Sequence, residues 1–107
     1  FFEEARRRAD FWGRLVESSV GAFLANAIRG VPFELFYWSS RNREVDFVLA
    51  RGDEIVAIEV KSGRKETTLP GLEAFSREFP IKRRILVGSR GIPLDEFFCF
   101  SVEDLFR

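Results

Sequence analysis

The chain has 107 residues, of which 46% are hydrophobic and 32% charged, and its 17 basic side chains balance its 17 acidic ones. This length and this mixture predict one globular domain, residues 1–107, and they exclude a disordered chain. No apolar run is close to the length of about 20 residues that a membrane span needs. The absence of His excludes Ser-His-Asp triads and His-based zinc sites, so catalysis would have to use carboxylates, Lys, hydroxyls or a metal held by oxygen.

The cysteine content and the start of the chain indicate where the protein works. Cys99 is the only cysteine, so no disulfide can form within the domain, and no signal-peptide pattern begins the sequence. We therefore expect a cytoplasmic protein, and the missing initiator Met leads us to expect part of a longer chain. Cys99 lies in the apolar run of residues 97–100. With no His to activate it, we expect it to be a buried core residue rather than a nucleophile.

The first third of the chain predicts one amphipathic helix, from Asp10 to Gly30. Its apolar residues recur at steps of three or four, which is typical of a helix packed on one face. They are Trp12, Val16, Val20, Phe23, Leu24, Ala27 and Ile28. Asp10 is a candidate N-cap and Gly30 a candidate stop signal. We interpret residues 1–9 as the tail of a preceding element.

Three strands are expected next, over residues 34–38, 44–50 and 55–61. The first is rich in aromatic residues, which favour strands. The third begins with a continuous apolar run that predicts burial on both faces. The second alternates, and the apolar residues expected on one of its faces are Val45, Phe47 and Leu49.

The last third predicts a helix over residues 70–79, which begins at a Pro, and a strand over residues 83–88. We expect a further edge strand over residues 97–100. Ser101 and Asp104 have the spacing of a capping box, which predicts a short final helix. The order is α-β-β-β-α-β followed by β-α, so the fold class is α/β.

The hairpin formed by the second and third strands brings acidic residues together. If its turn centres on Gly52 and Asp53, the register that follows places Asp46 opposite Glu59, and facing Cβ atoms lie about 4.5–5.5 Å apart. Lys61 lies two residues after Glu59 and shares its sheet face. Two facing carboxylates repel each other, so the arrangement makes physical sense if a divalent cation lies between them.

The expected cofactor is Mg²⁺ or Mn²⁺, held by Asp46, Glu59 and the backbone carbonyl of Val60. Such a cation polarises a phosphodiester, and Lys61 would position the attacking water or stabilise developing negative charge. The alternative is structural. In the same register Glu44 faces Lys61, so these two residues would form a plain cross-strand ion pair, and Asp46 would face solvent.

Glu17 is a further candidate on the first helix. Gly13 and Gly21 lie one turn before and after it, and a Gly inside a helix costs about 1 kcal/mol relative to Ala. The two glycines predict a close approach of the helix to another backbone. Glu17 would then be a third carboxylate or would orient a metal-bound water. The alternative is a solvated helical Glu, as most are.

Basic residues flank the acidic positions and predict a rim that contacts nucleic-acid phosphates. They are Arg41, Arg43, Arg64 and Lys65. In the register above, all four would lie near Lys61. The alternative is that they are solvated surface residues, as most charge runs are.

These residues resemble a known motif. Asp46 followed by Glu59-Val60-Lys61 on the next strand is similar to the PD-(D/E)XK motif of the restriction-endonuclease-like superfamily. Val45 stands where the motif has Pro, which takes no part in the chemistry. The resemblance implies a restriction-endonuclease-like core with a mixed central sheet flanked by helices. It also implies that Asp46 and Glu59 bind metal, that Lys61 is catalytic, and that Glu17 corresponds to the acid on the first helix.

A second resemblance spans most of the chain. The segments WGRLVE at 12–17, FYW at 36–38, EVDF at 44–47 and IEVK at 58–61 are similar to the C-terminal domain of a group of bacterial and archaeal AAA-type ATPases. This resemblance implies a preceding ATPase module. Residues 1–107 contain no Walker-type phosphate loop, so we do not expect them to hydrolyse ATP alone.

Two functions remain open. The first is a metal-dependent endonuclease domain that acts on DNA. The second is a catalytically silent interaction domain of an AAA-type ATPase, which the neutral net charge and 13 Phe residues favour. The expected partners are DNA, the ATPase module and a second copy of the chain in a homodimer, and no membrane is expected. The apolar tail at residues 97–106 is either a docking surface or, as we expect, part of the core.

Overall fold

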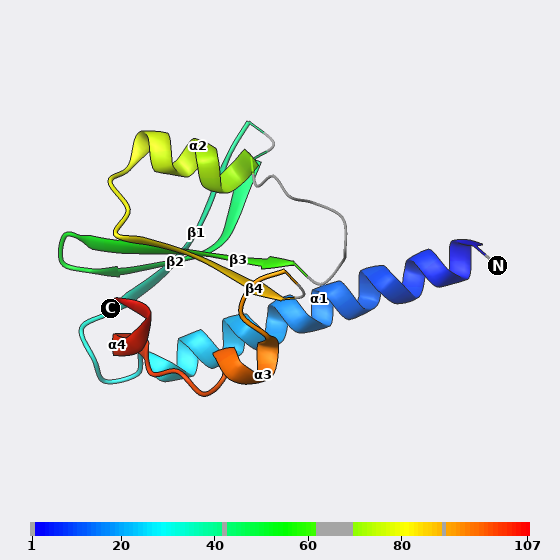
Figure 1. Ribbon diagram of the computed structural model, residues 1–107, viewed down its shortest axis with the longest axis horizontal. Helices are drawn as coiled ribbons and strands as arrows, with labels where there is room; N and C mark the ends of the chain where they lie inside the picture. Colours follow the sequence, from blue (N-terminus) through cyan, green and yellow to red (C-terminus); the bar gives the residue numbers. More distant parts are fainter. Residues whose placement is uncertain (1, 42, 62–69, 89) are drawn as a thin grey trace.

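The computed structural model describes residues 2–41, 43–61, 70–88 and 90–107. It has an α/β architecture in the predicted order α-β-β-β-α-β, with two short helices after the last strand (Figure 1). The elements are α1 (Phe2–Ala27), β1 (Glu34–Ser40), β2 (Arg43–Arg51), β3 (Glu54–Lys61), α2 (Pro70–Glu78), β4 (Arg83–Gly88), α3 (Leu94–Phe97) and α4 (Val102–Leu105). Among the described residues, no helix is long and apolar enough to cross a membrane.

The four strands form one mixed sheet in the order β1-β2-β3-β4. The first three pair antiparallel through short turns, and β3 and β4 pair parallel. A parallel pair needs a crossover connection, and α2 lies in the segment that joins β3 to β4. Figure 1 shows α2 on one face of the sheet and α1, α3 and α4 on the other. The sheet is therefore the middle of three layers.

Each layer of helices covers its own hydrophobic cluster. The larger cluster lies between the sheet and α1, and Val20, Leu24 and Ile58 in it are fully buried. The smaller cluster lies under α2 and includes Leu72 and Phe75. The middle of β3 serves both clusters, since Val56, Ala57 and Ile58 have no exposed surface. This confirms the predicted burial of that strand on both faces.

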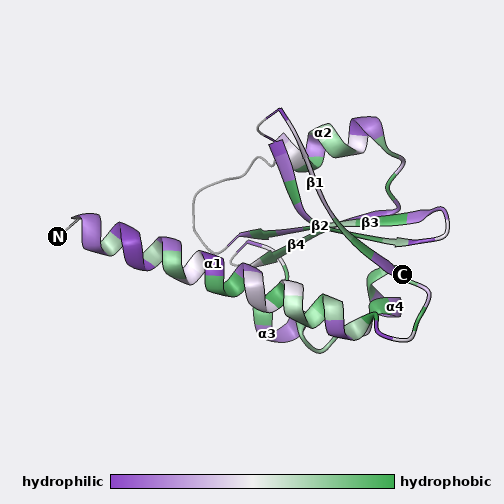
Figure 2. Cartoon of the chain, turned by 180° about the vertical axis from the view of Figure 1, so that it is seen from behind, coloured by the Kyte–Doolittle hydropathy of each residue, from purple (hydrophilic) through white to green (hydrophobic). Residues whose placement is uncertain are grey.

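Helix α1 is longer than its apolar stripe predicted, and Asp10 is an interior residue rather than an N-cap. The added first turns contain ion pairs at i and i+4, Glu3 with Arg7 and Glu4 with Arg8, which support an exposed helix. The start of α1 projects beyond the rest of the domain, and hydrophilic residues dominate there (Figures 1 and 2). Residues 3–9 therefore continue the same helix instead of ending a preceding one.

A β-bulge in β2 overturns the predicted alternation of Val45, Phe47 and Leu49. The register moves from Phe36 opposite Val48 to Trp38 opposite Val45, so β2 carries one extra residue at this point. Consequently Val45 joins the cluster under α2, whereas Phe47 and Leu49 pack on the side of α1.

The C-terminal segment forms helices instead of the predicted edge strand at residues 97–100. Helix α3 ends at Phe97, which is fully buried together with Phe106, so this tail is core, as expected. Cys99 is exposed, which contradicts its predicted burial, because it follows α3 on the outer side of the turn. The capping box of Ser101 and Asp104 at the start of α4 is confirmed.

Candidate functional site

The β2–β3 hairpin has the register that the sequence predicted. Arg51 lies opposite Glu54 and Ala50 opposite Ile55, and the regular pairing continues to Phe47 opposite Ile58. Beyond that point come Asp46 and Glu59, which we call the acidic pair. The acidic pair therefore stands where the regular ladder ends, beside the bulge in β2.

Each member of the acidic pair binds the backbone of the opposite strand. The amide of Asp46 donates to Glu59 Oε1 at 3.3 Å, and the amide of Val60 donates to Asp46 Oδ2 at 2.8 Å. The carboxylates thus take the place of carbonyl acceptors at the open end of the hairpin. These bonds fix both side chains before any ligand binds. The carbonyl of Val60 stays a predicted metal ligand.

Glu59 is the one charged residue among the buried side chains that the structure describes, with 5% of its surface exposed. Burial and the neighbouring Asp46 raise the pKa of the Glu59 carboxyl from its usual value to about 8. The amide of Asp46 and the positive charge of Lys61 only partly oppose this shift. At neutral pH the Glu59 carboxyl therefore favours its protonated form far more than an exposed Glu does.

Glu17 on α1 approaches the acidic pair. Partial burial of its carboxyl and the proximity of Asp46 raise the pKa of Glu17, and Lys61 opposes the change. Much of the Glu17 side chain is nevertheless exposed. No group of three or more His, Cys, Asp and Glu side chains within the described ranges is arranged to hold a metal ion. Glu17 therefore lies beside the acidic pair without completing a three-ligand metal group.

The close approach of α1 that the glycines predicted occurs at Gly21. A Cβ built there would lie 3.0 Å from the ring of Phe47, which packs on the α1 side of the sheet. The neighbour is a side chain rather than the backbone that the sequence analysis expected. This contact brings α1, and with it Glu17, close to Asp46.

Lys61 is half-buried at the end of β3 and pairs with Gly88 of β4. Gly88 has a φ of 131°, and a Cβ there would collide with the carbonyl oxygen of Lys61. Lys61 also lines a depression of about 360 Å³ together with Trp12 and Val16 of α1. The alternative of an ion pair between Lys61 and Glu44 does not occur, since no such pair forms between these two described residues.

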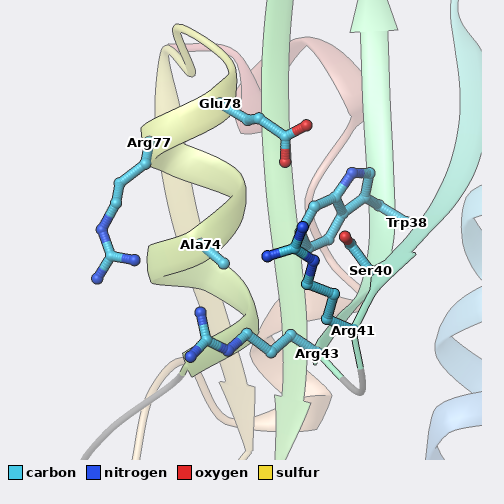
Figure 3. Close-up of a pocket in the computed structure, with 7 residues that line it drawn as sticks. All are labelled: Trp38, Ser40, Arg41, Arg43, Ala74, Arg77 and Glu78. Atoms are coloured by element: carbon cyan, nitrogen blue, oxygen red, sulfur yellow. The ribbon is translucent and has the colours of Figure 1, made fainter.

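Two of the four basic residues predicted to contact phosphates lie together, but away from Lys61. Arg41 and Arg43 line a groove of about 380 Å³ between the β1–β2 hairpin and α2, which does not include Lys61. Figure 3 shows these two arginines reaching toward α2 and Glu78 reaching back toward Trp38. We call this the arginine groove; its lining is Trp38, Ser40, Arg41, Arg43, Ala74, Arg77 and Glu78. Arg64 and Lys65 lie outside the described residues.

Sequence reasoning missed the contribution of α2 to this groove. Arg77 and Glu78 are more than thirty positions from Arg43, and their pattern on the helix was not distinguishable from an ordinary solvated face. One signal was available: Leu72 and Phe75 define the buried side of α2, which leaves Arg77 on its exposed side. Locating the groove would also have required knowing which face of β2 each residue occupies, and the bulge changes that.

The comparisons with known proteins place the chain in a family. Residues 12–102 match the family described as a domain of unknown function, DUF4143, which is found at the C-termini of AAA-type ATPase proteins. No curated protein matches the sequence. The matched region includes the acidic pair, Lys61, Glu17 and the arginine groove. Since it covers most of the 107 residues, the chain belongs to the DUF4143 family.

Proposed function

We propose that this domain is a divalent-metal-dependent nuclease that hydrolyses phosphodiester bonds in DNA. The observation that carries the proposal is the acidic pair: a buried Glu59 held against Asp46 at the open end of two strands. Two adjacent carboxylates with little access to water are unfavourable unless a cation or a proton neutralises them. A domain that keeps them there has a reason to bind a cation.

The donor set fits Mg²⁺ or Mn²⁺. Mg²⁺ is bound through one or two carboxylates and keeps several waters, so it does not need a third protein carboxylate. Asp46 and Glu59 would hold it, with the carbonyl of Val60 as a further oxygen ligand. A cation bound there would supply Lewis-acid polarisation of a phosphodiester.

The remaining residues would act on the substrate and on water. Lys61 is close enough to lower the pKa of both Glu17 and Glu59, so its ammonium group can stabilise negative charge that develops on a phosphate. Burial and the neighbouring Asp46 raise the pKa of Glu17, which would accept or hold a proton near the pair. Glu17 and Lys61 would both take part in catalysis.

The order and pairing of the helices and strands also support this proposal. The α-β-β-β-α-β order, with an antiparallel hairpin that carries the acids and a parallel pair beyond it, is compatible with a restriction-endonuclease-like core. Fold alone does not decide function, so the proposal depends on the acidic pair.

The test is a nuclease assay on single-stranded, duplex and branched DNA with Mn²⁺ and Mg²⁺. We expect cleavage by the wild type and a loss of at least about a hundredfold in Asp46→Asn and Lys61→Ala, since the first removes a proposed metal ligand and the second removes the ammonium group that would stabilise developing negative charge. Glu103→Gln, an exposed acid on α4, is the matched control and should cleave normally. Cleavage that survives in Asp46→Asn would show that the activity comes from a contaminant or from another site.

The second candidate is a catalytically silent domain that binds an AAA-type ATPase module or a second copy of itself. The reciprocal backbone bonds of Asp46 and Glu59 favour it, because they give both acids a structural role without metal. Under this alternative, calorimetry would detect no Mg²⁺ or Mn²⁺ binding to the wild type. A complex with the ATPase module would then form equally well with Lys61→Ala.

A further inference from the structure

The arginine groove lies apart from the acidic pair, and its lining is rich in basic residues. Three arginines and a single acid, Glu78, line it. Neither Arg41 nor Arg43 forms an ion pair within the described part of the chain, and Arg77 has only a long contact of 3.9 Å with Glu73. On a chain of zero net charge, this is a local excess of uncompensated positive charge.

The three arginines come from two different elements: Arg41 and Arg43 reach toward α2, whereas the Arg77 side chain points outward from the helix at the rim of the groove (Figure 3). Arg41 and Arg43 flank the tip of the β1–β2 hairpin, and Arg77 lies on the last turn of α2 (Figure 3). The hairpin is held against α2 by Trp38, whose ring meets that of Phe75 edge-on at 5.2 Å. Close packing at Gly71 fixes the other end, since a Cβ there would collide with the backbone of Glu44. The groove is thus built on packed elements.

The backbone conformation of one residue in the groove is also unusual for its residue type. Arg41 has a φ of 51°, and it is the one non-glycine residue with a positive φ in the described chain. The first loop position of a two-residue hairpin usually holds Gly, Asn or Asp, which adopt this conformation readily. An Arg retained at such a position is consistent with a use for its side chain.

We propose that the arginine groove binds the phosphodiester backbone of a single nucleic-acid strand. Guanidinium groups match phosphate oxygens through paired hydrogen bonds, and several of them along one groove suit an extended polyanion. Arg43 lies three residues before Asp46 on β2, about 10 Å along the strand. The groove lies on the α2 side of the sheet and the acidic pair on the α1 side, so a strand bound at both would have to pass around the end of β2. The choice of nucleic acid as the ligand rests on the proposed nuclease function.

The test measures binding of a labelled single-stranded oligodeoxynucleotide to the 107-residue chain by fluorescence anisotropy, in EDTA and across a NaCl series. We expect Arg41→Ala, Arg43→Ala and Arg77→Ala each to weaken binding roughly tenfold. Each should also make the dependence of affinity on salt less steep by about one phosphate contact. Arg29→Ala and Arg84→Ala, exposed arginines outside the groove, should bind like the wild type. Equal affinity for all five variants would overturn the proposal.

A second readout reports on the groove directly. The chain has two tryptophans, and Trp12 lines the other depression, so Trp12→Phe leaves Trp38 as the only indole. The oligonucleotide should change the fluorescence of Trp38 in this variant, and Arg43→Ala should remove the change. An unchanged Trp38 signal at saturating oligonucleotide would count against the groove. Full competition by polyglutamate, or by inorganic phosphate at the same phosphate concentration, would overturn a nucleic-acid strand as the ligand.

Binding in EDTA separates this inference from the proposed function. Binding that depends on the three arginines, without cleavage by the wild type in Mn²⁺, would retain the groove and refute the nuclease. Cleavage that needs Asp46 but is unaffected by the arginine substitutions would retain the nuclease and refute the groove.

Discussion

The acidic pair and the arginine groove lie a few residues apart on β2 and differ in nearly every physical respect. The acids are held by backbone hydrogen bonds, Glu59 is buried, and its pKa is raised. The arginines are exposed and project from a hairpin tip and a helix. The acidic pair is therefore suited to one small cation in a fixed place, and the groove to a long and adaptable polyanion. The two regions therefore differ because of their burial and backbone contacts, although they are close together on one strand.

The largest expected effect on stability comes from substituting Gly71, where α2 packs directly against the backbone of β2. In Gly71→Ala the new Cβ would lie 2.6 Å from the carbonyl carbon of Glu44, so α2 must move away from the strand. We expect a loss of about 3 kcal/mol in the free energy of unfolding, measured with urea. Binding of the oligonucleotide should weaken as well, since Arg77 moves with α2.

Gly52→Ala is the control for Gly71→Ala. Gly52 has a positive φ of 59° but nothing within 4 Å of a Cβ, so only the backbone term of about 1 kcal/mol applies. If Gly71→Ala is no more destabilising than Gly52→Ala, the tight seating of α2 on Glu44 is wrong, and with it the rigid groove.

The next effect tests the acidic pair through pH. The pKa of Glu59 is about 8 in the folded domain and near the usual 4.5 in the unfolded chain, so the folded state binds the extra proton between these values. The contribution of Glu59 protonation to the free energy of unfolding is therefore fully present below about pH 4.5 and is lost as pH rises toward 8. Unfolding in EDTA should show a decrease of roughly 3 kcal/mol between pH 5 and pH 8, which Glu59→Gln should abolish. Added Mg²⁺ should restore stability at pH 8 in the wild type only.

Glu54 on the same strand provides a control of opposite sign. Its hydrogen bonds with Lys82 and Arg51 lower its pKa, so its contribution is present above the usual value and is lost as pH falls. Glu54→Gln should therefore leave the decrease between pH 5 and pH 8 unchanged. A wild type whose stability stays flat over this range would show that Glu59 is not buried beside a charged Asp46.

The sequence predicted the acidic pair better than its surroundings, for a physical reason. The register of the hairpin follows from a tight turn at Gly52, so the meeting of Asp46 and Glu59 could be inferred from spacing alone. The bulge could not, because Val45, Phe47 and Leu49 read as plain alternation, and the extra residue shows only in the pairing with β1. The same limit hid the exposure of Cys99, since an apolar run does not distinguish a strand from a short helix and its turn.

The smallest effect sharpens the comparison by separating stability from binding at one residue. Arg41 has a positive φ that Gly adopts without steric strain, so Arg41→Gly should stabilise the domain by about 0.5–1 kcal/mol. The same change removes a guanidinium from the groove, so oligonucleotide affinity should fall while the melting temperature rises. Arg43→Gly, in the extended strand next to the turn, should lose both stability and affinity. A rise in melting temperature at Arg41 with unchanged affinity would show that this side chain does not contact the bound strand. If instead the melting temperature rises while affinity falls, the Arg41 side chain contributes to binding at the expense of stability.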